Sequence, residues 1–576
     1  MDWTVMKMAG NILLSALFKA VFAFFAITPF FCGGGEIELH TPAPVFEKAD
    51  VFSKILQVLP PGKYETSAPA VRCFSNRHPI AYYSDFAPLK EGGFVSADVT
   101  VTPEGTPRFL LSGFQWQTAL CAVLISTLCV LTLLFFRNRK KGIVQENSLY
   151  ESFSLIMIAV LIRQILMLLE TAFWGNALPS AADEPGYFKV VYDLLHGSCA
   201  GPWNFTVGLG ILYLPFVLLT GAKEYYDIAI AFSYFDALVL APLAMGFFFF
   251  ILKNLNFRNG TAFAAILIWA LYPFFIYHAE LWDQRIFRSF AALPCFLEGV
   301  SDWWRFYSVC INGGFNAMSD MPGLTLVLGT VLLAQKLKLT PWNTFFIGAA
   351  YGFCCLVRIN YIFFAPALAY ICLEKIDLKE WKTLLKLTGC GAGGFFAIFG
   401  WQLLVNGYQF GDSLTFGYVL HYLDFPPEKR PDTGFNWYTL LEWQNLRFLA
   451  GANSFLMMAG IMGLGFLKDR TTRSLLTLLS VPLILFFLGY THTYCDARRF
   501  IMMAFPVFIA AFCGGVRDVF SSVMSKSGKI TLGIFLLLML LLWFMPPEIY
   551  GICLCLLLLR TLFDLQQELF RGILIK

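Results

Sequence analysis

The chain has few charged residues. Asp, Glu, Lys and Arg together make up 14% of the 576 residues, whereas soluble domains contain about 25%. This shortage excludes a soluble domain of this size, and the hydrophobic share of 58%, with 61 Phe, indicates a polytopic membrane protein. The net charge of +4 and the absence of a long basic run argue against a nucleic-acid partner. The 15 Cys are scattered without the spacing of a metal site.

The apolar runs and the short charged loops between them predict an all-α membrane protein with about 14 transmembrane helices. The basic cluster at 137–141 is expected in the cytoplasm, and the later basic loops agree with that orientation. We expect five parts, in this order: a membrane anchor helix at 1–35, a small β-rich extracytoplasmic domain at 36–113, a second span with a cytoplasmic loop at 114–149, the main transmembrane module at 150–516 and a C-terminal transmembrane extension at 517–576.

Three details support this division. The apolar run that ends near Phe31 is long and lacks an Ala-x-Ala site, so we interpret it as a retained anchor and not as a cleaved signal peptide. The alternation in Phe94–Thr102, followed by Pro103, predicts strands and turns. Thr206–Thr220 is apolar but shorter than the roughly 20 residues of a span. We therefore expect an interfacial or re-entrant helix there, because a crossing would move every later basic loop to the other side.

Two adjacent carboxylates, Asp183 and Glu184, follow the apolar segment Tyr150–Phe173 and should lie just beyond the outer membrane face. Ionisable residues at the mouth of a membrane helix are candidates for chemistry. The simpler interpretation is that both carboxylates cap the turn at Pro185 and the helix that follows, where negative charge favours the N-terminus.

The chain resembles the GT-C membrane glycosyltransferases, a superfamily that includes the protein O-mannosyltransferases and the aminoarabinose transferase of lipid A. The resemblance extends over roughly Tyr150–Val516 and rests on motifs that occur in matching order and sidedness. They are Asp183-Glu184-x-x-Tyr187 with the amphipathic run to Gly197, Gly201-Pro202-Trp203 before Gly208–Gly221, Ser319–Pro322, Gly352–Arg358, Asn406-Gly407 with Phe410–Leu414, and Asp496–Phe500 with Pro506.

The resemblance implies transfer of a sugar from a polyprenyl-phosphate carrier, with inversion, to a lipid, glycan or protein acceptor at the outer face. Such a donor has a good leaving group, so the reaction needs a base for the acceptor hydroxyl and positive charge near the departing phosphate. Asp183 is our candidate base. Glu184 is expected to bind a sugar hydroxyl, the acceptor or a metal, and dependence on Mg²⁺ or Mn²⁺ stays open.

Asp320 is a second acidic candidate, expected either to face the same outer cavity or to cap the helix that it begins. Arg498 and Arg499 are candidates for the donor phosphate, because two arginines at an outer helix end run against the positive-inside bias. A salt bridge to Asp496 is the alternative. Arg358, between two short apolar segments, is expected to bind the donor phosphate or to lock a carboxylate.

Tyr187, His278 and His492 are candidates for lining the donor and acceptor cavity. No histidine pair has metal-ligand spacing, and lone histidines at helix ends are more typical of hydrogen-bonded interface positions. The β-rich insertion and the long loop Trp282–Ser319 depart from the usual GT-C pattern and leave the acceptor open.

Two other functions fit a chain of this composition. A transporter or flippase would place coupling charges at the membrane midplane and is commonly built of two related halves. We find no such duplication, and the charges that we singled out gather at one face. An envelope-polymer polymerase or ligase would depend on the arginines of Trp282–Ser319.

The expected location is a bacterial inner (plasma) membrane, with the active site on the periplasmic face.

Overall fold

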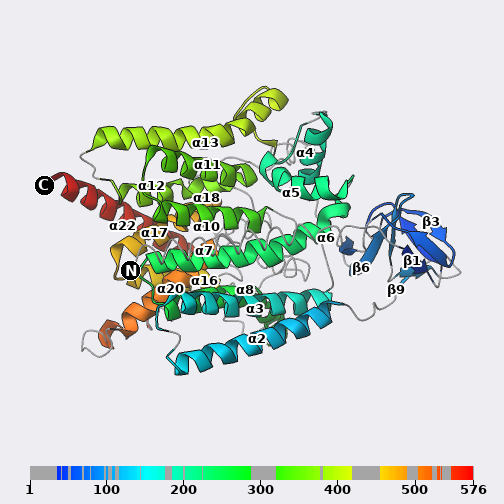
Figure 1. The fold of residues 1–576 in the computed structure, drawn as a ribbon, viewed down its shortest axis with the longest axis horizontal. Coiled ribbons are helices and arrows are strands. Elements are labelled where there is room, and N and C mark those ends of the chain that lie inside the picture. The colour runs from blue at the N-terminus through cyan, green and yellow to red at the C-terminus, as the bar shows by residue number, and fades with distance from the viewer. Residues whose placement is uncertain are drawn as a thin grey trace. The chain divides into compact units, whose positions relative to one another are not determined.

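The computed structural model of the chain (Figure 1) is mostly helical, with a small β region near the N-terminus. It describes residues 36–39, 42–49, 53–67, 71–77, 80–96, 99–101, 107–109, 116–142, 145–174, 184–198, 202–223, 225–286, 319–376, 380–417, 454–489, 504–521, 529–531, 533–534, 537 and 547–574. The chain divides into two compact units, one comprising 1–150, 160–242 and 302–318 and the other 151–159, 243–301 and 319–576.

The β region belongs to the first unit and contains a five-stranded antiparallel sheet in the order β3-β2-β7-β6-β5. Ala43, Val45, Leu89 and Val95 form one buried cluster of this region. Phe46 and Phe86 are also buried and pack edge to face at 5.9 Å between ring centroids. Two-stranded sheets pair β1 with β4 and β8 with β9. The strands are β1 Glu36–Leu39, β2 Ala43–Phe46, β3 Ile55–Leu59, β4 Gly62–Glu65, β5 Val71–Arg77, β6 Ile80–Pro88, β7 Phe94–Ser96, β8 Val99–Val101 and β9 Pro107–Phe109.

A small β region near the N-terminus is thus confirmed, whereas the bounds 36–113 and the location outside the membrane stay predictions. The alternating run Phe94–Thr102 contains strands, as its pattern predicts. It contributes two short strands, β7 and β8, to two different sheets, because sheet membership is decided by the distant partners of each strand.

The helices follow the apolar runs. In the first unit they are α2 Trp116–Lys140, most of α3 Leu149–Trp174, α4 Glu184–His196, α5 Val207–Thr220, α6 Tyr226–Phe235 and the π-helical turn η1 Asp236–Leu240. Those of the second unit are α7 Ala241–Asn254, α8 Asn259–Ile286, α10 Asp320–Lys336, α11 Pro341–Val357, the 3₁₀ turn η3 Ile359–Phe364, α12 Ala365–Leu373, α13 Trp381–Phe410, α16 Ser454–Phe466, α17 Arg470–Leu478, α18 Val481–Gly489, α20 Phe505–Phe520 and α22 Pro547–Leu574.

Within the described residues, three helical segments are long and apolar enough to cross a membrane, namely Leu149–Leu166, Ala231–Asn254 and Trp381–Phe410. Shorter apolar helices occupy Val207–Thr220, Asn259–Tyr272, Pro341–Val357 and Ile359–Leu373. A membrane protein is therefore supported, while the total of about 14 spans stays a prediction. The segment 206–220 does form a helix shorter than a span, which ends at Gly221 in the left-handed conformation (φ 65°).

Glycines allow helix pairs of the second unit to approach closely. Figure 1 shows α11 lying along α13, where a Cβ on Gly348 would stand 2.0 Å from the carbonyl oxygen of Gly391 and one on Gly394 would stand 1.9 Å from that of Phe345. In the same way, a Cβ on Gly463 of α16 would stand 2.2 Å from the backbone of Ala511 of α20. Small residues at helix contacts are typical of packing in membranes, where backbones must approach to gain van der Waals contact.

Candidate functional site

Helix α4 begins at Glu184, the second member of the predicted acidic pair. Its carboxylate is fully buried, at 0% exposure, in the first turn, where the partial positive charge of the helix N-terminus stabilises an anion. The helix ends at Gly197 (φ 64°), and the amide of Ser198 donates to the carbonyl of Asp193 at 2.9 Å. This is the glycine-terminated hydrogen-bond pattern that stops a helix. The amphipathic run predicted between Glu184 and Gly197 is therefore a helix.

The first turn of α4 is held by aromatic packing. The ring of Tyr187 is buried and stacks on Phe205, with 4.3 Å between ring centroids. Gly186 lies so close to the same Phe205 ring that a Cβ there would come within 2.4 Å of a ring carbon. On the next helix, a Cβ on Gly210 would stand 3.3 Å from the carbonyl oxygen of Tyr187. The residues after the acidic pair are thus locked onto α5 and the segment before it.

Asp193 ties the end of α4 to the same segment. Its carboxylate accepts hydrogen bonds from Trp203 Nε1 at 3.0 Å, from Lys189 Nζ at 2.5 Å and from Ser198 Oγ at 3.3 Å. Burial acts to raise the pKa of Asp193, but the hydrogen bonds from Lys189 and Trp203 outweigh it and hold that pKa below its usual value. Asp193 therefore remains ionised and fixes the loop that carries Trp203.

Asp320 and Arg358 form a buried ion pair in the second unit. Arg358 follows α11 with an extended backbone, and its NH1 donates to Asp320 Oδ1 at 2.5 Å and to Ser319 Oγ at 3.2 Å. Both side chains are under 10% exposed. In the described contacts Arg358 pairs with the Asp320 carboxylate, and its functional role stays a prediction. The N-cap position of α10 belongs to Ser319, and Asp320 is the first helical residue.

Tyr361 completes this corner. Its hydroxyl donates to the carbonyl of Asp320 at 3.1 Å. Its ring packs against Gly323 so closely that a Cβ there would stand 2.3 Å from a ring carbon. The start of α10 and the chain after α11 are thereby fastened at two points. Removing one partner of such a buried pair is strongly destabilising, because it leaves the other charge desolvated and uncompensated.

The remaining predicted residues are not placed by the structure. Asp183, Arg498, Arg499 and His492 lie outside the described residues, and His278 lies in α8 but its side chain is likewise outside them. Of the predicted set, Glu184 and Tyr187 share α4, and Asp320 and Arg358 are brought together. The roles of all of them stay predictions.

The structure adds a polar cluster in the first unit, and its members lie within two candidate membrane spans. Arg163 of α3 and Asp236 at the start of η1 are both buried, at 1% and 0% exposure, and interact electrostatically. The neighbouring Gln164 donates from Nε2 to the carbonyl of Ala237 at 2.5 Å. A π-helical turn disturbs the regular backbone hydrogen bonds and often occurs at functional positions. Ionisable residues within predicted apolar runs were the signal that could have identified this cluster.

Within the described part of the chain, no group of three His, Cys, Asp or Glu side chains is arranged to hold a metal ion. Comparison with known protein families, with characterised proteins and with solved structures finds no match. The resemblance to GT-C enzymes consequently rests on the sequence motifs alone.

Proposed function

We propose that the chain is a GT-C-type membrane glycosyltransferase with about 14 transmembrane helices. It transfers a sugar, with inversion, from a polyprenyl-phosphate donor to a lipid, glycan or protein acceptor. The reaction takes place at the periplasmic face of a bacterial inner membrane, with Asp183 as the base. Arg498 and Arg499 supply positive charge to the leaving phosphate.

One observation carries this proposal more than any other. The acidic pair ends in a carboxylate, Glu184, that is wholly buried on the first turn of α4. In the chain, α4 is the next described helix after α3, which contains a candidate membrane span. Burying a carboxylate is costly, so a position that only had to cap a helix would be better served by an exposed side chain. The packing of Gly186 and Tyr187 on Phe205 gives this turn the rigidity that a catalytic group requires.

Asp320 and Arg358 have a supporting role in this scheme. Because each charge neutralises the other at 2.5 Å, the pair orients the start of α10 and does not compete for the donor phosphate. We therefore assign the pair to positioning, and the phosphate to the two arginines at 498 and 499.

The test is sugar transfer from radiolabelled polyprenyl-phosphate donors to a crude pool of membrane lipids and proteins, with and without Mg²⁺ or Mn²⁺. Asp183→Asn is compared with wild type and with Glu146→Gln, which removes an exposed carboxylate elsewhere, at equal membrane yield. A general base contributes roughly 10²–10⁴-fold, so Asp183→Asn should lose at least 100-fold while the control keeps full activity. Full activity of Asp183→Asn, or no transfer by wild type from any donor, contradicts the proposal.

A second candidate function, transport or lipid flipping, is favoured by the cluster around Arg163 and Asp236. Contrary to the expectation that charges gather at one face, these two lie within candidate spans, where ionisable residues commonly mark a transport pathway. Lipid flipping is tested by following a fluorescent polyprenyl-phosphate analogue across the bilayer of proteoliposomes. A flippase would be favoured if wild type moved the analogue and Asp236→Asn, at normal yield, did not. Neither protein should then transfer sugar.

A further inference from the structure

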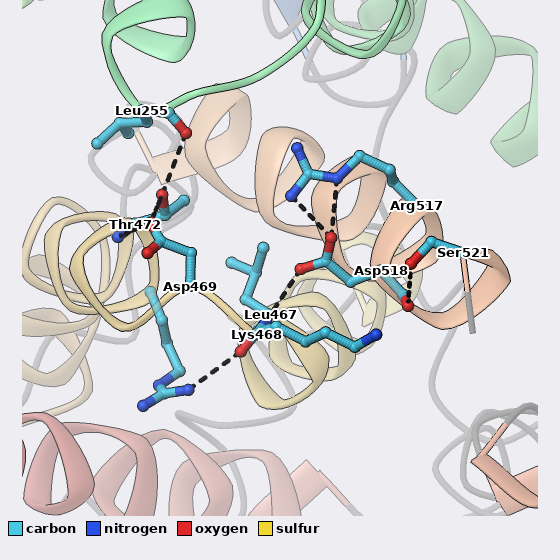
Figure 2. A network of polar contacts seen from close by, with 9 residues as sticks. Leu255, Leu467, Lys468, Asp469, Thr472, Arg517, Asp518 and Ser521 are labelled. Carbon is cyan, nitrogen blue, oxygen red and sulfur yellow. Dashed lines mark hydrogen bonds and ion pairs between the residues drawn. The ribbon is translucent and has the colours of Figure 1, made fainter. Parts of the chain in front are cut away.

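Three chain segments of the second unit meet at one end of its helices. They are the turn 255–258 between α7 and α8, the turn 467–469 between α16 and α17, and the last turn of α20. Thr472 Oγ1 donates to the carbonyl of Leu255 at 3.2 Å, and the amide of Lys468 donates to Asp518 Oδ2 at 2.9 Å. Figure 2 shows both links in one view.

The carboxylate of Asp518 is the centre of this arrangement. Arg517 donates from Nε to Asp518 Oδ1 at 2.8 Å, so the guanidinium and the backbone of Lys468 lie on different oxygens of one carboxylate (Figure 2). The guanidinium carbon of Arg517 lies 5.0 Å from the ring centroid of Phe257, a cation–π contact. Phe257 is itself buried, at 1% exposure, against Gly514.

Three cationic residues belong to these connected segments, namely Arg258, Lys468 and Arg517, and we name them the basic junction. Arg258 is the next residue in the chain after Phe257, whose ring contacts the guanidinium of Arg517. Arg258 and Lys468 are exposed, and within the described part of the chain neither side chain is paired with a carboxylate. Two carboxylates, Asp518 and the α17 N-cap Asp469, lie beside these three cations, so the junction is a surface site with a net charge of +1.

The depth of the basic junction is set by the helices that lead to it. The candidate span Ala231–Asn254 ends four residues before Arg258, Lys468 comes two residues after the end of α16, and Arg517 lies in the last turn of α20. Cations just past the ends of apolar helices lie at the level of the lipid headgroups. This end is the one that the distribution of Lys and Arg predicts to be cytoplasmic.

We propose that the basic junction binds the phosphate of an anionic glycerophospholipid. A phosphate diester can accept hydrogen bonds from Arg258 and Lys468 together, while Arg517 is held in place by Asp518 and Phe257. Free phosphate has the same chemistry, but a position at the ends of three apolar helices also provides a surface for the acyl chains. Basic sites between membrane helices on the cytoplasmic side are the kind that bind acidic headgroups. This site is independent of the proposed transferase reaction.

The test uses the purified full chain in nonionic detergent, with bound phosphatidylglycerol or phosphatidylcholine counted by native mass spectrometry. Wild type should retain phosphatidylglycerol in preference to phosphatidylcholine. The double variant Arg258→Gln/Lys468→Gln should bind it about 25-fold more weakly, at roughly fivefold per cation near the surface. The matched control, Lys382→Gln/Lys386→Gln, removes two exposed cations at the start of α13 and should bind like wild type.

Three results would overturn the proposal. One is equal retention of the two lipids by wild type. Another is an equal loss of phosphatidylglycerol from both double variants, which would indicate a general charge effect. The third is displacement of the lipid by millimolar inorganic phosphate, which would make the junction a site for the free ion. Unfolding temperature and elution volume verify that the variants fold, as expected because the mutated side chains are exposed.

Discussion

Asp320→Asn is the substitution whose effect the structure defines most clearly. Asparagine keeps the shape of the side chain but removes its charge, so the guanidinium of Arg358, itself only 3% exposed, loses the negative charge of Asp320 beside it. Removing one partner of a buried ion pair destabilises a protein by about 3–5 kcal/mol. Because almost no new cavity is created, we assign this expected loss to desolvated charge and not to packing.

A double-mutant cycle isolates the pair. Arg358→Gln alone should also be destabilising, because it leaves the Asp320 carboxylate buried. The combination Asp320→Asn/Arg358→Gln contains no charge and should be more stable than the sum of the single losses predicts, by roughly 2–3 kcal/mol. The free energy of unfolding is measured by titrating sodium dodecyl sulfate into mixed micelles of the purified protein.

The exposed pair Glu65–Lys90 provides a control of similar geometry, at 2.6 Å but with both side chains more than half exposed. Its coupling should be much smaller than that of the buried pair, because water screens exposed charges. Additive losses at Asp320 and Arg358, or a coupling no larger than that of the exposed pair, would refute the inference that burial makes the inner pair strong.

Three further predictions concern other parts of the chain. Gly186→Ala should lower the free energy of unfolding by roughly 1–3 kcal/mol, because its methyl group would stand 2.4 Å from the ring of Phe205. Unfolding in sodium dodecyl sulfate measures this loss, and Phe205→Leu in the same chain should restore part of it. The hydrogen bond from Lys90 lowers the pKa of Glu65 below its ordinary value of 4.5. The pair therefore stabilises the fold above pH 4.5, and this contribution is lost as the pH falls through the lowered pKa. The difference in unfolding midpoint between wild type and Glu65→Gln should shrink over the same fall in pH. Asp564→Asn should expose α22 to limited proteolysis, because the carboxylate pairs with two arginines of α17 at 2.7 and 3.7 Å; unchanged cleavage would contradict this.

Much of the helical architecture could be predicted from the sequence, because an apolar run of membrane length leaves the backbone few alternatives to a helix. The expected segment Tyr150–Phe173 and the observed helix Leu149–Trp174 nearly coincide. Helix ends were harder to predict. Helix α13, Trp381–Phe410, extends beyond its apolar centre, since its polar flanks continue the helix until Gly411 and the turn capped by Asp412 stop it.

The pairing of site residues could not be predicted. The sequence indicates Asp320 and Arg358 as separate candidates, but their pairing depends on how α10 packs on α11, which no local pattern encodes. The cluster of Arg163 and Asp236 was missed for a different reason. Each was absorbed into an apolar run as a single polar exception, although a charge inside a span requires compensation.

Buried charge decides how variants of this chain must be interpreted. Asp320 has a defined partner whose loss destabilises the protein, so lost activity in Asp320→Asn would follow from unfolding alone and would say nothing of chemistry. Asp183→Asn is informative only if its stability equals that of wild type. Glu184→Gln lies between these cases, because its buried position predicts a stability effect and its place on α4 predicts an activity effect. If Glu184→Gln kept its unfolding free energy but lost sugar transfer, the burial of this carboxylate would serve the reaction; if both fell together, it would serve the fold.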